Sequence, residues 1–472
     1  MKRTNKNKAA RTACGRGGFG GGLESLETRQ LFSGVGANFY LVPLSSTKTE
    51  LVCDLTNPAE TVTASSFSDG VQFFVNGQMA NILGNYAYMS IVAQSGNNSI
   101  TLEKNLTVPS CVWAGTGNDL LSTGSNNDSM RAGAGDDTIV ALGVGDKLFA
   151  GTGYTNMWSD TLNTYWKSTG TLVTHFFSSF LNTSDMSLDG AAIAEPSLIG
   201  TGVTFSGSYQ NFSSSSHPLF GNSGPVISDV IQENIGDCYL LSGLGTIANA
   251  DPQQIQNSIT SLGDGTYAME FYENGSPVFV RVDGELPVQD GQLFGANFGN
   301  NGCIWVPLME KGFAYFDSIE QGDSPSYAVI DKGGFADPTL YALTGTVPQG
   351  TYNVFNGSDS MSMFDDSETN FANWINEELG QGDAIEMAIY NGTSNEMAIP
   401  NILVNDHMYG VLSDTVNASG KITGFWVRNP WGVDTPDGMA AAGHNDGQND
   451  GKVWITVAEA WSVTEDIGAV SV

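Results

Sequence analysis

The sequence predicts two unlike domains in one chain, an all-β solenoid followed by an α+β domain. Two observations indicate the solenoid: short β-rich runs separated by turn residues between about 38 and 107, and a nine-residue repeat from 114 to 155. One observation indicates the α+β domain: from residue 226 onward helix-like and strand-like runs are mixed, with the helices before a β-rich end. A length of 472 residues agrees with several domains, because one core rarely serves so long a chain.

The charge balance excludes some classes of partner. The chain has 18 basic and 50 acidic residues, a net charge of −32, and six of the basic residues lie within positions 1–16. Such a surface repels nucleic acids and anionic membranes and suits multivalent cations. No stretch approaches 18 consecutive apolar residues, so we expect no transmembrane segment.

Five cysteines are too few for a disulfide framework. For Cys53 and Cys111 two interpretations stay open: they pair in an oxidising compartment, or both are buried thiols.

Residues 1–34 are basic and glycine-rich and lack the apolar core of a signal peptide, so we expect a disordered N-terminus. Within it, residues 23–33 read Leu-Glu-Ser-Leu-Glu-Thr-Arg-Gln-Leu-Phe-Ser. This segment resembles a short motif near the N-termini of exported or surface proteins of planctomycete-type bacteria. The resemblance implies a secreted protein or one held at the bacterial cell surface; a chance amphipathic turn in a disordered tail is the alternative.

The nine-residue repeat predicts a stack of identical turns. Its five copies begin at residues 114, 123, 132, 141 and 150, and the apolar positions between them include Leu121, Met130, Ile139 and Leu148. Glycines permit tight turns, aspartate and carbonyl oxygens coordinate a hard cation, and the apolar position fills the core.

The repeat resembles the RTX nonapeptide, whose turns stack into a parallel β-roll that holds Ca²⁺. The resemblance implies a β-roll domain over residues 35–160 with Ca²⁺ ligands at Asp119, Asp128 and Asp137. A solenoid that stacks without metal is the alternative.

Residues 161–220 carry few regular signals and predict a linker. After it, the stretch 232–248 places Cys238 at the start of a helix, because Leu240, Leu241, Leu244 and Ile247 recur at helical spacing and Asp237 is a suitable N-cap. A helix N-terminus favours thiolate over thiol, and the thiolate is the reactive form. Gln232, in the preceding loop, can return its amide as an oxyanion donor. The alternative is an inert buried thiol.

A thiol nucleophile needs a base, and His407 is the candidate among the four histidines. It lies on a β-like run, and a second run leads to Asn429. A hairpin with Leu412 near Lys421 puts His407 opposite Trp426, about three residues from Asn429, and a shifted register or a bulge would close the gap. In a Cys-His-Asn site, the imidazole takes the thiol proton and the asparagine fixes its tautomer. A structural histidine and an ordinary Asn-Pro turn are the alternatives.

Two segments resemble the calpain-type cysteine peptidases: Gln232-Glu-Asn-Ile-Gly-Asp-Cys-Tyr-Leu-Leu241 and Asn429-Pro-Trp-Gly432. Glu233, Tyr239 and Asp406 depart from the family pattern. The resemblance, over roughly residues 222–472, implies a papain-like fold of two lobes, 221–345 with the cysteine and 346–472 with the histidine and asparagine. It also implies that Trp431 shields the His-Asn bond and that Asp229 and Glu310 bind Ca²⁺.

The sequence thus predicts a calcium-dependent cysteine endopeptidase that acts on protein substrates through Cys238, His407 and Asn429, with Gln232 in the oxyanion site. The first alternative is a non-catalytic, calcium-binding surface or adhesion protein that uses the fold as a scaffold. The second is acyl transfer to an amine, against which Asn429-Pro-Trp speaks because a transglutaminase has an aspartate there.

Overall fold

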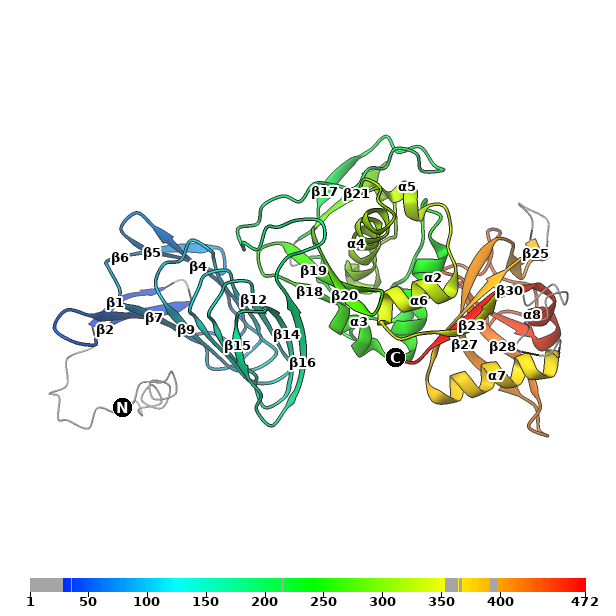
Figure 1. Cartoon of the computed structure of the whole chain (residues 1–472), viewed down its shortest axis with the longest axis horizontal. Helices are drawn as coiled ribbons and strands as arrows, with labels where there is room; N and C mark the ends of the chain where they lie inside the picture. Colours follow the sequence, from blue (N-terminus) through cyan, green and yellow to red (C-terminus); the bar gives the residue numbers. More distant parts are fainter. Residues whose placement is uncertain (1–28, 35, 214–215, 353–363, 365–366, 391–396) are drawn as a thin grey trace. The chain divides into compact units, whose positions relative to one another are not determined.

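The computed structural model describes residues 29–34, 36–213, 216–352, 364, 367–390 and 397–472. It divides into two compact units (Figure 1). One runs to Phe180 and includes Ser184–Ala191 and Leu262–Asp264, and the other comprises Leu181–Thr183, Ala192–Ser261 and Gly265–Val472. Most of the export-like motif at 23–33 lies outside the described residues.

The first unit is a β-solenoid with two eight-stranded sheets. One sheet contains, in spatial order, β1 (Arg29–Gly34), β2 (Ala37–Pro43), β3 (Thr49–Leu55), β7 (Tyr88–Val92), β9 (Ser110–Thr116), β11 (Ser129–Ala134), β13 (Lys147–Phe149) and β15 (Thr164–Trp166). The other contains β16 (Thr171–Phe177), β14 (Tyr154–Asp160), β12 (Asp137–Ala141), β10 (Leu120–Thr123), β8 (Ser99–Leu102), β4 (Thr61–Phe67), β5 (Gly70–Val75) and β6 (Gln78–Leu83).

Successive coils of the solenoid are offset by two repeats. Leu121 pairs with Ile139, and Ile139 pairs with Met157, in parallel register. Alternate repeats therefore lie on opposite sheets, and the apolar position of each repeat reaches the shared core, where Leu121, Met130, Ile139 and Leu148 are fully buried. The predicted parallel β-roll is confirmed.

The solenoid extends beyond the predicted boundaries. Arg29–Gly34, predicted to be disordered, pair with β2 as strand β1. At the other end, β15 and β16 fall within the predicted linker and pair in parallel with β13 and β14. These last strands continue the coils without the Gly-Asp turn signature on which the prediction depended. Cys53 is a free thiol buried in the core, so its pairing with Cys111 is wrong.

The second unit is α+β and has two lobes with separate cores, one formed mainly by residues 193–343 and one by residues 364–469. The first lobe carries the helices η1 (Ile227–Asp229), α2 (Cys238–Ala250), α3 (Pro252–Ser258), η2 (Asn300–Gly302), α4 (Trp305–Glu320), α5 (Tyr327–Ile330) and α6 (Ala336–Thr344). Its strands form two sheets, β17 (Ser208–Asn211), β21 (Glu285–Gln289), β22 (Gln292–Leu293), and β18 (Ile259–Ser261), β19 (Thr266–Glu273), β20 (Ser276–Asp283).

The second lobe is built on a six-stranded sheet with the order β23 (Gln349–Tyr352), β30 (Thr464–Val470), β24 (Ala384–Ile389), β27 (His407–Val416), β28 (Ile422–Arg428) and β29 (Lys452–Thr456). It also carries α7 (Glu368–Gln381), α8 (Val457–Val463) and the short pair β25 (Met397–Ile399) and β26 (Leu403–Val404). The C-terminal strand β30 pairs with both β23 and β24, which closes the lobe. Within the part of the chain that the structure describes, no helix is both long enough and apolar enough to span a membrane.

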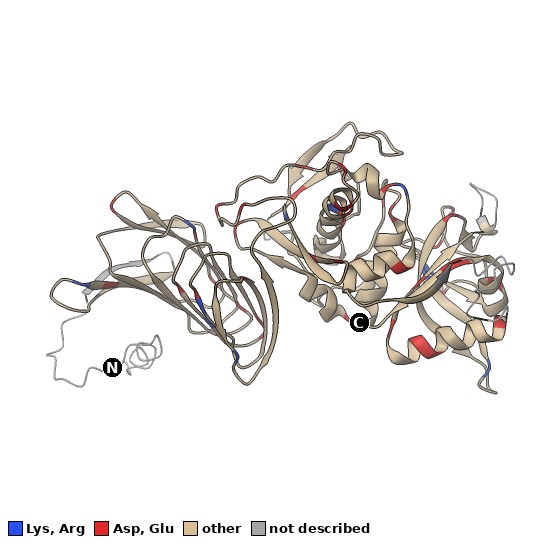
Figure 2. Ribbon diagram, in the orientation of Figure 1, with Lys and Arg blue, Asp and Glu red and all other residues tan. Residues whose placement is uncertain are grey.

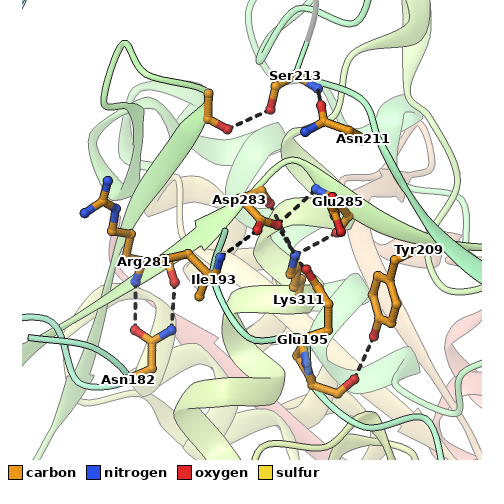
Figure 3. A network of polar contacts seen from close by, with 12 residues as sticks. Asn182, Ile193, Glu195, Tyr209, Asn211, Ser213, Arg281, Asp283, Glu285 and Lys311 are labelled. Atoms are coloured by element: carbon orange, nitrogen blue, oxygen red, sulfur yellow. Dashed lines mark hydrogen bonds and ion pairs between the residues drawn. The ribbon is translucent and has the colours of Figure 1, made fainter. Parts of the chain in front are cut away.

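Much of the predicted linker is fixed to the first lobe. Lys311 on α4 is fully buried and forms ion pairs of 2.7 Å with Glu195 and with Asp283 (Figure 3). The Tyr209 hydroxyl donates to the Pro196 carbonyl at 2.7 Å. A buried ammonium needs paired carboxylates. The segment that supplies Glu195 is therefore part of the fold of this lobe.

Candidate active site

Cys238 is the first residue of α2, and the packing of the rest of that helix fixes its position. From Tyr239 to Ala248 every residue of the helix is buried, with the apolar ones in the core of the first lobe. Cys238 itself is half-buried. Asp237 occupies the N-cap position, as predicted, but its side chain makes no capping hydrogen bond; it is fully buried and points elsewhere.

His407 and Asn429 meet across the β27–β28 hairpin. The register predicted from the sequence was wrong: Gly410 pairs with Arg428, and a bulge lies between Val411 and Ser413. This pairing brings the His407 Nε2 within 2.8 Å of the Asn429 Oδ1. The centroids of the Trp431 and His407 rings lie 4.5 Å apart.

The Asn429 amide is held by a neighbour that sequence reasoning missed. Asn429 Nδ2 donates to the Asp434 carbonyl at 3.3 Å, and Oδ1 also accepts from the Trp431 N–H at 3.0 Å. The buried Asp434 carboxylate accepts three backbone N–H groups, from Ala440, Asp450 and Gly451, at 3.0 to 3.2 Å. Asp434 thereby shapes the loop that orients Asn429. The only feature of the sequence that could have indicated this contact is the position of Asp434, five residues after Asn429.

A cleft of about 780 Å³ lies between the lobes, and Gln232, Cys238, His407 and Trp431 all line it. Several hydrogen bonds join the lobes. Among them, Gln232 N–H donates to the Pro430 carbonyl at 2.9 Å, and the Ser242 hydroxyl donates to the Met408 carbonyl at 3.0 Å. Asn429 lies behind the cleft, fully buried. The structure therefore brings the predicted nucleophile, base, asparagine and oxyanion donor to one place.

The other three histidines, all described, have structural contacts outside this cleft. His175 stacks on Trp158 with centroids 4.1 Å apart. His217 and His444 each bond a backbone carbonyl through Nδ1, at 3.1 and 2.8 Å.

Burial keeps both the thiol and the imidazole neutral. It raises the pKa of Cys238 to about 12, against the opposing effect of a backbone hydrogen bond at Met408. It lowers the pKa of His407 to about 4, against the opposing effect of the bond to Asn429. In the cleft without substrate, burial therefore opposes the preference for thiolate that the helix N-terminus predicts.

Gln232 is buried, and its amide faces the loop before Cys238. Nε2 donates to the Ile235 carbonyl at 2.7 Å and to Asp237 Oδ1 at 3.3 Å. The bond to Asp237 is long and therefore weak, so the Gln232 N–H that forms it is the one that a ligand in the cleft could engage.

Asp229 and Glu310 do not fit a calcium ion as they are arranged. The Asp229 carboxylate accepts from the Asn300 N–H at 2.8 Å, the Trp305 indole at 2.8 Å and two further donors. Both Glu310 oxygens accept the Ala296 N–H at 2.9 Å. Burial raises the pKa of Glu310 to about 7, against the lowering effect of that bond and of a hydrogen bond with the neighbouring Asp237. Burial, and then the charge of Glu310, raise the pKa of Asp237. Protein donors thus satisfy oxygens that a cation would need.

The repeat turns fit calcium better, although not as predicted. Asp119, Asp137 and Asp146 each have one carboxylate oxygen, Oδ2, that is buried without a hydrogen-bond partner among the described residues. Asp128 differs, because its Oδ2 accepts from the Thr123 and Ser125 hydroxyls at 2.8 and 2.6 Å. A buried carboxylate oxygen without a partner is costly and suits a cation. The residues that fit are therefore Asp119, Asp137 and Asp146, and Asp128 does not.

Two family models match the sequence. The model "Calpain family cysteine protease" matches residues 210–458, and the model "RTX calcium-binding nonapeptide repeat (4 copies)" matches residues 112–153.

Curated proteins are also similar to part of the chain. The chain is 23% identical over 269 residues to the calpain-2 catalytic subunit of Rattus norvegicus, which covers 51% of this chain and 35% of that protein. It is 25% identical over 227 residues to calpain-9 of Rattus norvegicus (46% and 30%) and 27% identical over 222 residues to calpain clp-1 of Caenorhabditis elegans (43% and 25%). The chain thus spans between a quarter and about a third of the length of these relatives.

Proposed function

Because this chain belongs to the calpain family of cysteine proteases, we propose that it is an endopeptidase that hydrolyses peptide bonds in proteins through Cys238, His407 and Asn429. One observation carries the proposal: Cys238 and His407 line a single cleft, and His407 bonds Asn429 at 2.8 Å. The neutral imidazole donates its Nε2–H to the Asn429 oxygen, which leaves Nδ1 as the unprotonated nitrogen.

The chemistry follows from this tautomer. The Cys238 sulfur attacks the substrate carbonyl carbon while His407 Nδ1 takes the thiol proton. Because thiol and imidazole are both neutral beforehand, proton transfer accompanies attack rather than preceding it. The C–N bond then breaks, the leaving amine takes the proton from Nδ1, and water hydrolyses the thioester by the same route in reverse.

The negative oxygen of the tetrahedral intermediate needs donors. The Cys238 N–H, at the first residue of α2, has no acceptor within the helix. Gln232 supplies the N–H that otherwise makes the long bond to Asp237. Each such donor contributes about 10²- to 10³-fold to rate in related chemistry.

In this proposal, calcium binds to the β-roll. Asp119, Asp137 and Asp146 would hold it there through their partnerless oxygens, and a bound cation would neutralise buried carboxylates and so stabilise the turns. The calcium dependence predicted from the sequence then depends on the roll rather than on Asp229 and Glu310. RTX repeats also favour a secreted or cell-surface protein of bacterial origin, with protein substrates met outside the cell.

Casein hydrolysis by the purified full chain tests the proposal. We expect cleavage by the unmodified protein with calcium, less cleavage with chelator, and none by Cys238→Ala. Cys303→Ala is the matched control, since Cys303 is a free, buried thiol outside the cleft, and it should retain activity.

Each comparison in this experiment tests one part of the proposal. Activity that persists in Cys238→Ala would remove the cysteine mechanism. Activity unchanged by chelator would remove only the calcium dependence. A third outcome is that no form cleaves casein although circular dichroism shows each form to be folded. If iodoacetamide also leaves Cys238 unlabelled, that outcome would support the non-catalytic scaffold interpretation.

A further inference from the structure

One end of the cleft is acidic. Asp406, Glu465 and Asp466 line it together, and among the described residues none of the three makes an ion pair. We call these three residues the acidic end. They belong to the second lobe and take no part in the bond-breaking steps described above. Figure 2 shows that acidic positions outnumber basic ones across the chain, 50 against 18 in the sequence, so a cluster of acids is by itself no evidence of a site.

The sheet brings the three carboxylates together. β24 lies between β27 and β30, so that Ala388 pairs with Met408 on one side and with Asp466 on the other. Neighbouring strands lie about 4.8 Å apart, which places Asp466 about 10 Å from the backbone beside His407. The acidic end is therefore within two or three substrate residues of the reacting bond.

Asp466 is the buried floor of this end. It is 2% exposed, and its Oδ2 accepts the Ala336 N–H at 3.1 Å, but its Oδ1 has no hydrogen-bond partner among the described residues. Burial first, and then the nearby Asp337 and Glu465, raise the pKa of Asp466 to about 7. Burial, and then the charges of Asp466 and Asp337, raise the pKa of the neighbouring Glu386 well above its usual value. A cation at Oδ1 would relieve this repulsion.

The shape favours an organic cation over a metal ion. In the described part of the chain, no three metal-binding side chains lie close enough to share a metal. Phe335, the residue before Ala336, also lines the cleft and is 57% exposed. An aromatic surface beside a carboxylate suits a side chain with an apolar stem and a charged head.

We propose that the acidic end is a substrate subsite for an arginine or lysine side chain, so that the enzyme prefers protein segments with a basic residue close to the cleaved bond. This inference deepens the proposed function and rests on it. Asp466 binds the charged head, Glu465 and Asp406 add to its attraction, and Phe335 covers the stem. Unfolded basic segments are then the substrate class.

Fluorogenic peptidyl-coumarin amides test the subsite, because their cleavage site is fixed. Three pairs of peptides carry either arginine or its neutral isostere citrulline at one of the three positions before the coumarin. We expect arginine to raise kcat/KM about tenfold to a hundredfold over citrulline at one position, as charge-assisted hydrogen bonds do. The ratio should fall to about one in Asp466→Asn, which keeps an oxygen for the Ala336 N–H. Asp437→Asn, an exposed acid of the same lobe outside the cleft, should leave the ratio unchanged.

Two further measurements keep the inference falsifiable. Glu465→Gln should lower the arginine-to-citrulline ratio of kcat/KM in part. This second variant tests the subsite even if Asp466→Asn does not fold. The ratio in the unmodified protein should rise from pH 6 to pH 8, because Asp466 ionises as the pH passes its raised pKa while arginine stays charged.

Binding of the same peptides to Cys238→Ala, by fluorescence polarisation, needs no turnover. A preference for arginine there, without hydrolysis by any form, would keep the subsite and overturn the proposed function. Equal ratios for arginine and citrulline in the unmodified protein, or a ratio unaltered by Asp466→Asn, would overturn the subsite and leave the proposed function intact.

Discussion

The Asn429 side chain is the most constrained group of the candidate site. Its oxygen lies 2.8 Å from His407 Nε2 and 3.0 Å from the Trp431 N–H, while its nitrogen donates to the Asp434 carbonyl. An amide with its nitrogen engaged in this way cannot flip. The oxygen therefore always faces the imidazole, and His407 keeps one tautomer without a neighbouring negative charge.

Replacing Asn429 tests this role separately from the nucleophile. The bond to Asn429 raises the pKa of His407, so Asn429→Ala should lower that pKa further. We expect kcat to fall by about 10²-fold or more, because the imidazole loses its fixed orientation. The acid limb of the kcat/KM profile should move to lower pH.

The control for Asn429 is Asn376→Ala, on the exposed face of α7, where the asparagine bonds only Asp414. It should leave both kcat and the pH profile unaltered. A loss of activity in Asn429→Ala with no shift of the acid limb would point to a structural role alone.

At the scale of the elements, β24 holds an acid where a sheet core is expected to be apolar. Glu386 is fully buried, and neither of its oxygens has a hydrogen-bond partner among the described residues. The residues beside it on the same rung are glycines, Gly468 on β30 and Gly410 on β27. A Cβ at Gly410 would lie 2.5 Å from the Thr246 side chain of α2, which shows how closely that helix approaches the sheet.

This buried acid predicts a pH-dependent stability. Burial and the charges of Asp466 and Asp337 raise the pKa of Glu386 well above its usual value. A group whose folded-state pKa is raised contributes stability below its unfolded pKa and loses it as the pH rises through the folded one. The pKa of Asp466, about 7, acts in the same direction. The second unit should therefore become less stable from about pH 4.5 to pH 8.

Glu386→Met removes the ionisable group and keeps the volume. We expect it to stabilise the second unit at pH 8 by about 1 to 3 kcal/mol, less at pH 5, and so to flatten the dependence of Tm on pH. Calorimetry at both pH values measures this. Glu377→Met, at an exposed position of α7, should keep the slope of the unmodified protein. Equal slopes for Glu386→Met and the unmodified protein would contradict the assignment.

At the scale of the whole molecule, two units with separate cores carry different ion chemistry. In the β-roll, Asp119, Asp137 and Asp146 each have a buried oxygen without a hydrogen-bond partner among the described residues. In the second unit, Asp229 and Glu310 are satisfied by protein donors. Calcium should therefore bind the first unit and stabilise that unit directly against thermal unfolding.

Calorimetry with and without calcium should then show two transitions that respond differently. Calcium at 100 times its Kd stabilises a single-site protein by about 2.7 kcal/mol, so the transition of the roll should rise by several degrees and the other should not move. Asp137→Asn should reduce the rise. Asp128→Asn is the matched control and should preserve it, because the Thr123 and Ser125 hydroxyls already occupy that carboxylate. A rise abolished equally by both changes would contradict the distinction between the turns.

Local patterns determined much of this protein from the sequence alone. The nine-residue repeat, with its turn glycines and inward apolar residues, predicted a parallel β-roll, and the strand register then showed two repeats to a coil. Apolar spacing after Cys238 fixes a buried helix with the thiol at its first residue. The residue types Cys238, His407 and Asn429 indicated a thiol nucleophile with its base, and the resemblance of the segments around Cys238 and Asn429 to calpain-type peptidases indicated the family.

Tertiary structure alone decided how these groups behave. The bulge after Val411 set the His407–Asn429 contact, since the register of a hairpin depends on turn and packing together. Burial, which no sequence pattern reports, raised the pKa of Cys238 and lowered the pKa of His407, and both shifts favour the neutral forms. Donors distant in the sequence bond the carboxylates of Asp229 and Glu310, and the hydroxyls of Thr123 and Ser125 bond the carboxylate of Asp128. By contrast, Asp466 Oδ1 has no hydrogen-bond partner among the described residues. Composition can count carboxylates, but only the fold determines which of them still need a cation, because that depends on which donors lie within about 3 Å.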